Sequence, residues 1–100
     1  MIKHIVMWNL KNNTDDTDRT TLCTELKKQL EGLKSQIPEI QAIEVGFNFN
    51  DSENSMDVVL YSTFALAADL EIYQSHPAHI KVAKFVGSVV SERKVVDYDI

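Results

Sequence analysis

Two stretches of the chain, Ile2–Leu10 and Asp57–Phe64, show the two-residue alternation of β-strands but carry apolar side chains on both faces. The clearest runs are residues 4–8 in the first stretch and residues 58–61 in the second. A strand with one face in water has polar residues at every second position. We therefore predict that both stretches are central strands of one sheet, and that both faces of this sheet are covered.

The region between these two strands predicts one long helix and a second strand. Pro38 ends the helix, because the residue before a proline avoids helical geometry, and Thr14–Asp18 offers several N-caps. Ile40–Asn50 alternates like a strand, and the polar stretch Asn50–Ser55 predicts the hairpin loop after it. The apolar residues of the helix, which spans about five turns, are Leu22, Leu26, Leu30, Leu33 and Ile37. Those of the strand are Ile43, Val45, Phe47 and Phe49.

The last third of the chain predicts two short helices and a final strand. Ala65–Gln74 forms the first helix, and Ser75-His76-Pro77 interrupts it, since proline is favoured in the first turn of a new helix. Arg93–Ile100 closes the chain as a strand. The predicted inward residues are Leu66, Leu70 and Tyr73 in the first helix and Ile80, Ala83, Val86 and Val90 in the second.

This order of elements, β-α-β-β-α-α-β, is the ferredoxin-like split βαβ pattern with its second helix broken in two. We therefore predict an α+β fold with a four-stranded antiparallel sheet. It forms one domain over residues 1–100, because half this length would be too short for an independent core. The helices cover only one face of such a sheet. Since the other face is apolar as well, we predict a homodimer in which the two open sheet faces meet as a barrel.

The charge and cysteine content of the chain argue against several classes of partner. Ten basic against fifteen acidic side chains give a formal net charge of −5. This balance argues against nucleic acid or an anionic membrane as a partner and leaves a small anionic ligand open. Cys23 is the only cysteine, so an intrachain disulfide and a thiolate metal cluster are impossible. Since no apolar run has the length of a signal peptide core or a membrane span, we expect a cytoplasmic protein.

The segment from Tyr73 to His79 carries the side chains that most suggest chemistry. The interruption at Pro77 changes the direction of the chain, which would turn His79 back toward Tyr73. A neutral imidazole is a suitable general base for a proton next to a carbonyl, and a tyrosine hydroxyl stabilises the carbonyl oxygen as it gains enolate character. The alternative is that these residues only pack. For His76 we favour this structural role, as a cap at the helix junction.

His4, Trp8 and Asp97 are the other candidate site residues. His4 shares a strand face with Trp8 and points either into a pocket under the helices or into the dimer barrel. If Trp8 shares that pocket, it leaves room for a small ligand or none. Asp97 lies in the last strand, beside the first, where it would orient His4 or cap the rim of the barrel. The spacing of His76 and His79 does not match a helical zinc motif, and no glycine-rich nucleotide loop is present, so we predict no metal and no cofactor.

Four parts of the chain resemble the stress-responsive dimeric α/β barrel (Dabb) family. They are Ile2–Val6, Ile37–Ile40 with Glu44–Gly46, Tyr73–His79 and Val95–Tyr98. Together with the order of elements, these parts span nearly the whole chain. The resemblance implies a ferredoxin-like barrel dimer, in agreement with the pattern of the strands.

The resemblance implies less about activity. Most bacterial members of the family have no assigned reaction, and several plant members are stress-induced proteins. One plant member, olivetolic acid cyclase, is a polyketide cyclase that catalyses an aldol condensation without a redox cofactor. Its catalytic pair resembles Tyr73 and His79, and a histidine that matches His4 lies in the same pocket. Some plant members also hold a metal through main-chain carbonyls, near the position of Lys34–Ile40 here.

Two functions therefore stay open. In the first, the chain is a dimeric stress-response protein without a defined catalytic role, or one that binds a small carbonyl compound between sheet and helices. In the second, it is a cofactor-independent cyclase or lyase with His79 as general base and Tyr73 orienting the carbonyl.

Overall fold

The structure is a computed structural model that describes residues 1–12 and 16–100, with side chains for all of these except residues 16 and 17. The predicted N-caps at Thr14–Asp18 lie mostly outside this description. The elements in chain order are β1 (Ile2–Leu10), α1 (Asp16–Glu31), the 3₁₀ helix η1 (Gly32–Ser35), β2 (Ala42–Phe47), β3 (Val58–Phe64), α2 (Ala67–Ser75), α3 (Pro77–Val89) and β4 (Val90–Asp99).

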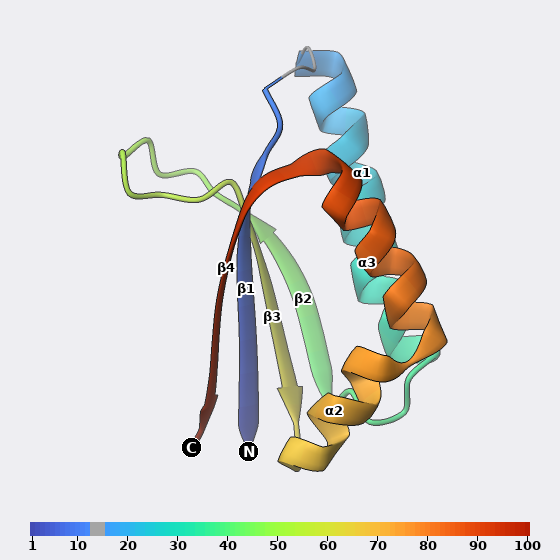
Figure 1. Cartoon of the computed structure of the whole chain (residues 1–100). Helices are drawn as coiled ribbons and strands as arrows, with labels where there is room; N and C mark the ends of the chain where they lie inside the picture. Colours follow the sequence, from blue (N-terminus) through green and yellow to red (C-terminus); the bar gives the residue numbers. More distant parts are fainter. Residues whose placement is uncertain (13–15) are drawn as a thin grey trace.

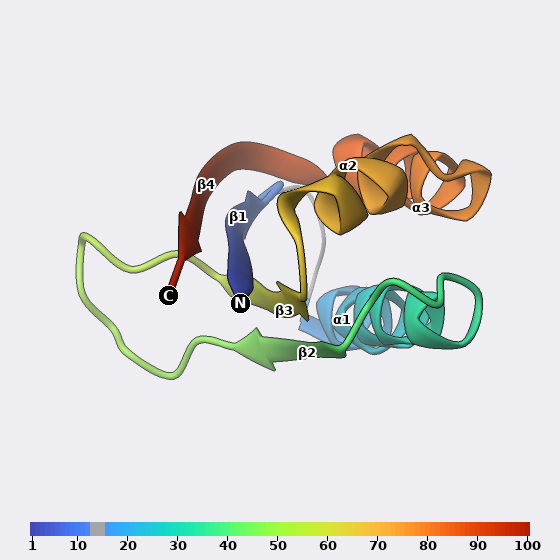
Figure 2. The same cartoon turned by 90° about the horizontal axis from the view of Figure 1, so that it is seen from below.

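The four strands form one antiparallel sheet in the order β2-β3-β1-β4. The two strands with apolar residues on both faces, β1 and β3, are the central pair, as predicted. The helices all lie on the same side of the sheet, as Figure 1 and Figure 2 show. The predicted α+β ferredoxin-like fold is therefore confirmed.

The core fills the space between the sheet and the helices. Every second residue of β1 points into it, so His4, Val6 and Trp8 are buried, while Ile5 and Met7 on the other face are half-buried. The helical stripe predicted from the sequence supplies the opposite wall, with Leu26, Leu33 and Ile37 at most 1% exposed. The same alternation that buries one face of β1 leaves the residues of its other face unprotected by any described helix.

The first helix is shorter than predicted. α1 ends at Glu31, and the chain continues as the 3₁₀ helix η1, in which Gln36 N–H donates to Leu33 O (3.0 Å). Gly32 starts this tighter turn and is a poor residue for a helix interior. Leu33 and Ile37 are still fully buried, so the apolar stripe continues past the end of the α-helix.

The second strand is also shorter than predicted, because it ends at Phe47 and does not include Phe49. Asn48 and Asn50 bond to each other through side chain and backbone, since Asn50 N–H donates to Asn48 Oδ1 (2.9 Å) and Asn48 Nδ2 donates to Asn50 O (2.6 Å). Such local bonds compete with the ladder of a sheet. Phe49 is therefore fully exposed.

The predicted inward face of the third helix was right for Val86 and wrong for Ile80 and Ala83. Val82 and Val86 are buried, whereas Ile80 and Ala83 are exposed, and Val90 is the first residue of β4. Several apolar residues lie close together in this helix, so its sequence offers two overlapping stripes. The position of the sheet below the helix selects the stripe that contains Val82 and Val86.

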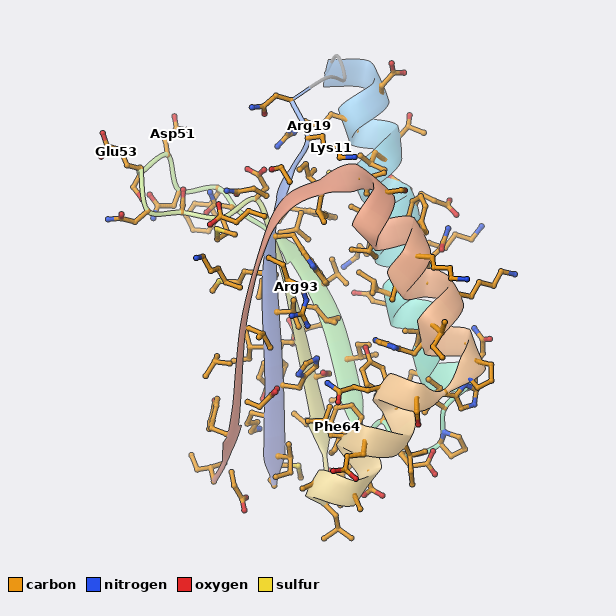
Figure 3. The ribbon with its side chains drawn as sticks, viewed as in Figure 1. Lys11, Arg19, Asp51, Glu53, Phe64 and Arg93 are labelled. Atoms are coloured by element: carbon orange, nitrogen blue, oxygen red, sulfur yellow. The ribbon has the colours of Figure 1, made fainter. Side chains whose placement is uncertain are left out.

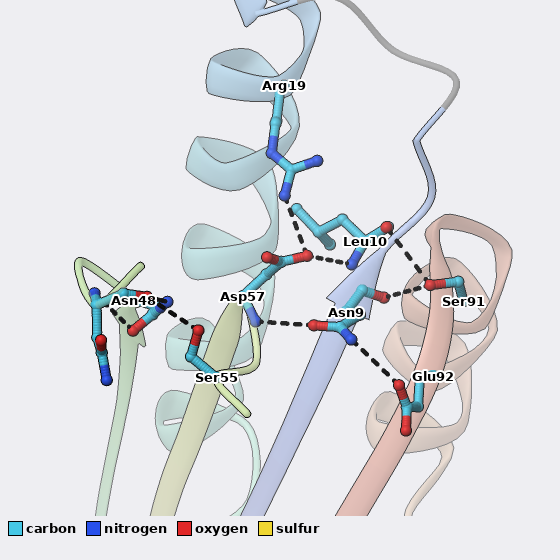
Figure 4. Close-up of polar contacts among 9 residues, drawn as sticks. Asn9, Leu10, Arg19, Asn48, Ser55, Asp57, Ser91 and Glu92 are labelled. Atoms are coloured by element: carbon cyan, nitrogen blue, oxygen red, sulfur yellow. Dashed lines mark hydrogen bonds and ion pairs between the residues drawn. The ribbon is translucent and has the colours of Figure 1, made fainter. Parts of the chain in front are cut away.

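Asp57 joins three elements at one end of the sheet (Figure 4). Its carboxylate accepts a hydrogen bond from Leu10 N–H (2.8 Å) and forms an ion pair with Arg19 of α1 (3.0 Å). Its own N–H donates to Trp8 O (3.0 Å) and to Asn9 Oδ1 (3.1 Å). Asp57 thus fixes the end of β1 against β3 and α1.

We expect the substitution Asp57→Ala to lower the free energy of unfolding by about 1–3 kcal/mol, since it leaves the partly buried Leu10 N–H without its acceptor. Urea unfolding followed by circular dichroism measures this change. Asp51→Ala, in the exposed loop, is the control and should stay within about 0.5 kcal/mol of the parent. Equal stability of the two variants would contradict this role of Asp57.

Candidate functional site

A cavity of about 140 Å³ lies between the sheet and the helices. It brings together four of the residues that the sequence singles out: His4 and Trp8 from β1, Tyr73 from α2 and His79 from α3. Apolar side chains form much of the remaining wall, among them Val6, Leu30, Leu60, Val82 and Val86. A small polar group of side chains in an apolar cavity is the usual composition of a ligand site.

The junction between α2 and α3 sets the direction of His79. His76 is extended (φ −65°, ψ 136°), and its Nδ1 accepts a hydrogen bond from Ala78 N–H (3.0 Å). Pro77 then occupies the first turn of α3, where its missing N–H costs nothing. His76 is not among the residues that line the cavity, and its place is the structural one that the sequence favours.

His79 has a defined tautomer. Its Nδ1 lies 3.1 Å from Gln74 O, and a carbonyl oxygen only accepts, so Nδ1 carries the proton and Nε2 of the neutral ring has the lone pair. Burial lowers the pKa of His79 below its usual value of 6.5; the hydrogen bond to Gln74 opposes this shift, and the charges of His4 and Arg93 add to it. At pH 7 His79 is therefore a neutral base whose Nε2 is able to accept a proton.

Tyr73 is fully buried, and its ring lies against two other rings, with centroids 4.4 Å from His79 and 5.1 Å from Phe64. Its hydroxyl has no hydrogen-bond partner among the residues that the structure describes. Burial raises the pKa of Tyr73 to about 12, against the opposing charge of Arg93, so the phenol stays a neutral donor at pH 7. A buried hydroxyl without a partner costs about 1–3 kcal/mol, which a ligand oxygen would recover.

The ring of His4 is hydrogen-bonded to Asp97 on the neighbouring strand. The two residues are directly opposite in the pairing of β1 with β4, and His4 Nδ1 is hydrogen-bonded to Asp97 Oδ1. Because the carboxylate accepts this bond, Nδ1 carries the proton and the second ring nitrogen of a neutral His4 is an acceptor. The His4 ring meets Tyr73 edge-on, with centroids 6.1 Å apart. Asp97 thus orients His4, one of the two roles predicted for it.

Arg93 is a residue of this site that the sequence interpretation did not identify. It lines the cavity from β4 opposite Trp8 and projects toward the helix layer, as Figure 3 shows. The signal was present in the alternation of the last strand, since Arg93 has the same parity as Asp97 and so lies on the same face. The predicted strand already contained Arg93, but its side chain was not assigned to the face that carries Asp97.

The described residues contain no group of three or more His, Cys, Asp or Glu side chains that could hold a metal ion. In Lys34–Ile40, where the resemblance implies a carbonyl-bound metal, the carbonyl of Ile37 already accepts a hydrogen bond from Ile40 N–H (3.2 Å). Among the described helices, none has both the length and the apolar character required to cross a membrane.

The fold and the cavity together define a ferredoxin-like α+β domain with a small polar site beneath its broken second helix. The chain belongs to the Dabb family, the stress responsive A/B barrel domain, whose family model matches residues 2–100. The resemblance seen in the sequence is thereby confirmed. Among curated proteins, the comparison finds no match.

Several solved structures share the fold. A dimeric protein of unknown function from Bacteroides fragilis is 31% identical, with a TM-score of 0.88, and the match covers 99% of this chain and 95% of that one. A protein from Arabidopsis thaliana is 22% identical, with a TM-score of 0.84 and coverage of 100% and 95%. The hydroxynitrile lyase from Passiflora edulis is 19% identical, with a TM-score of 0.79 and coverage of 99% and 92%. At such low identity the last two show the fold alone.

We expect NMR to show His79 titrating below pH 6.5 with its proton on Nδ1 in the neutral form. As the pH falls, the unfolded chain binds a proton at His79 before the folded chain does, because the pKa of His79 is lower in the folded state. The stability contribution of His79 is therefore present above pH 6.5 and is lost as the pH falls below that value. Long-range ¹H–¹⁵N spectra report both the titration and the tautomer. The variant His79→Gln should lose this part of the pH dependence of stability, and a His79 that titrates above 6.5 would contradict the prediction.

Proposed function

We propose that the chain binds a small carbonyl compound in this cavity and that His79 removes a proton from the carbon next to the carbonyl. This is the chemistry of a cofactor-independent lyase or cyclase. The observation that carries the proposal is the Tyr73 hydroxyl, which is buried without a partner among the described residues and belongs to a side chain that lines the same cavity as a neutral histidine base. Trp8 and the apolar residues of the wall would hold the body of the ligand, and His4 would contact its polar end.

Tyr73 and His79 have complementary tasks in this proposal. The Tyr73 O–H donates to the carbonyl oxygen, and Nε2 of His79 accepts the α-proton. The electron pair of the C–H bond becomes a carbon–carbon double bond, and the carbonyl oxygen becomes an enolate that Tyr73 stabilises. Return of the proton from His79 to carbon completes an exchange reaction. Alternatively, the enolate carbon attacks a second carbonyl, whose π electrons move to its oxygen, and this alkoxide takes the proton from His79; neither route needs an oxidant or a reductant. The high pKa of Tyr73 keeps its proton in place during these steps.

The size of the cavity limits the ligand. A volume of about 140 Å³ is below the range of about 300–1,000 Å³ that is typical of pockets for drug-sized ligands. Trp8 forms part of the wall. This is the condition under which the sequence favoured a small ligand or none. The site therefore favours a small carbonyl substrate of a lyase or cyclase over a long polyketide substrate.

The lyase from Passiflora edulis indicates that this fold can carry an enzyme of that class. Its identity to this chain is too low to transfer its reaction. A purely structural role in stress tolerance is the competing function, and the family description "stress responsive" is consistent with it. The unpaired Tyr73 hydroxyl favours a ligand, because a core that served only stability would gain from phenylalanine at that position.

We expect the protein to exchange the α-protons of small ketones or oxo acids for deuterium in D₂O, and His79→Gln to slow this exchange by about 100-fold or more. Proton NMR of the small molecules measures the rate. Tyr73→Phe should also slow exchange while leaving the free energy of unfolding unchanged or higher. Lys84→Gln, on the exposed side of α3, is the control. If no compound exchanges and none shifts the melting temperature, the proposal is wrong.

We further propose that the chain forms a homodimer through the open face of its sheet. This face is the one opposite the helices and carries Ile5, Met7, Val59, Tyr61, Val96 and Tyr98. Val96 and Tyr98 are 48% and 42% exposed. The loop of residues 48–57 extends on the same side, away from the helices (Figure 2), and presents the fully exposed Phe49. Exposed apolar residues over this area are typical of an interface.

The occupant we propose is a second copy of the chain. The structure from Bacteroides fragilis, at 31% identity, is that of a dimeric protein, and further similar structures from Thermobifida fusca and Jannaschia are also described as dimeric. A two-fold axis would place the same apolar residues opposite each other, which is how most homodimers are built.

We expect light scattering to give twice the mass of the chain at micromolar concentration, and Val96→Glu to weaken the dimer by about 10-fold or more, because a carboxylate would be buried without a partner. Val95→Glu is the matched control. Val95 is 46% exposed and adjacent in β4, but it lies on the helix side of the strand, opposite Val6. A monomeric parent, or equal dissociation of the two variants, would refute the interface.

A further inference from the structure

Arg93 is a cation at the wall of the candidate cavity, and no counter-ion for it lies among the described side chains. No ion pair or side-chain hydrogen bond joins its guanidinium to any residue in 1–12 or 18–100. It is exposed, lines the cavity, and projects from β4 toward the helix layer in Figure 3. The proposed reaction uses His4, Tyr73 and His79 and assigns no role to the charge of Arg93.

We propose that Arg93 selects a ligand with an ionised carboxylate, so that the substrate of this site is a small oxo acid. This inference rests on the proposed function, because it assumes that the cavity takes a carbonyl compound. The carboxylate would bind the guanidinium, which presents two parallel N–H donors to such a group. The carbonyl oxygen of the same molecule would then face the Tyr73 hydroxyl.

The acidic residues nearest to Arg93 in β4 are committed to other partners. Asp97, on the same face, is bonded to His4. Glu92 points to the opposite face, where it accepts from Asn9 Nδ2 (3.1 Å) and pairs with Lys94 (3.4 Å). A guanidinium that served only to stabilise the fold would be expected to use one of these carboxylates. Arg93 instead keeps all of its donors available beside the cavity.

The charge of Arg93 is close enough to act on the reacting groups. It lowers the pKa of both Tyr73 and His79, although in each case burial is the larger effect. Both ring systems lie in the same cavity as Arg93, with their centroids 4.4 Å apart. An anion bound to Arg93 would therefore lie beside the donor that stabilises an enolate and the base that forms it.

The charge balance of the reaction also favours this assignment. Removal of the α-proton from an oxo acid gives a product with two negative charges, the carboxylate and the enolate oxygen, while His79 becomes a cation. The chain as a whole has a formal net charge of −5, which disfavours an anion near its surface. A fixed cation at the cavity offsets this repulsion for the ligand and stabilises the charge that develops on it.

The test compares acids with their neutral amides. The probes are 2-oxobutanoate and 4-oxopentanoate, each paired with its primary amide, which has a similar shape without the charge. NMR titration of the parent protein, followed at the ring signals of Tyr73 and His79, gives a dissociation constant for each. We expect at least one acid to bind about 10-fold or more tightly than its amide.

The variant Arg93→Gln should remove this preference by weakening the acid while leaving the amide unchanged, and Arg93→Lys should keep part of it. Lys84→Gln, which removes the same charge from the exposed side of α3, should have no effect. Equal binding of acid and amide, equal loss of both in Arg93→Gln, or binding of neither would overturn the inference.

The two proposals fail in different ways. If ketones exchange their α-protons but acids have no advantage, the proposed function stands and the role of Arg93 is wrong. If acids bind through Arg93 and no compound exchanges a proton, Arg93 is an anion-binding residue and the catalytic proposal is wrong.

Discussion

The break between α2 and α3 is the constraint on which the candidate site depends. In a continuous helix, Tyr73 and His79 would be about 120° apart around the axis and would face different surroundings. The extended residue His76 and the proline after it redirect the chain, so that the last turn of α2 and the first turn of α3 face the same cavity. The break also leaves the Gln74 carbonyl without a helical partner, and His79 Nδ1–H satisfies it. A helix end thereby fixes which nitrogen of His79 is the base.

The buried polar groups under this break differ in whether they have hydrogen-bond partners. His4 is bonded to Asp97 through its ring, and Ser62, which is fully buried, donates to the His4 carbonyl (3.2 Å). Tyr73 is as deeply buried, yet its hydroxyl has no partner in the described chain. A buried hydroxyl without a partner costs a sizeable part of the stability of a small domain. The Tyr73 hydroxyl therefore supports the proposed ligand better than a role in packing alone.

The alternation of the strands and the break at Pro77 predicted most of the fold, because both follow from local chemistry. The inward face of α3 did not follow, since Ile80 and Val82 begin two equally apolar stripes and only the sheet chooses between them. Phe49 continued the strand pattern but lies past the point where local bonds of Asn48 end the ladder. The predicted site residues other than His76 and Asp97 share one cavity. Arg93 was missed although it lies in the predicted last strand, because a lone arginine in a strand does not by itself show which face it occupies.

The cavity and the proposed dimer interface lie on opposite faces of the same strands, and β4 connects them. This strand is at the edge of the sheet, and its residues are exposed from Ser91 to Asp99. It nevertheless carries Arg93, which lines the cavity, and Asp97, which is hydrogen-bonded to the cavity residue His4. Its other face carries Val96 and Tyr98, which a partner would cover. A partner that packs on these two residues would restrict β4 and, with it, the positions of Arg93 and Asp97 relative to His4. Ligand binding and dimer formation are therefore expected to strengthen each other, since each favours the same position of an edge strand that is otherwise held only by its pairing with β1.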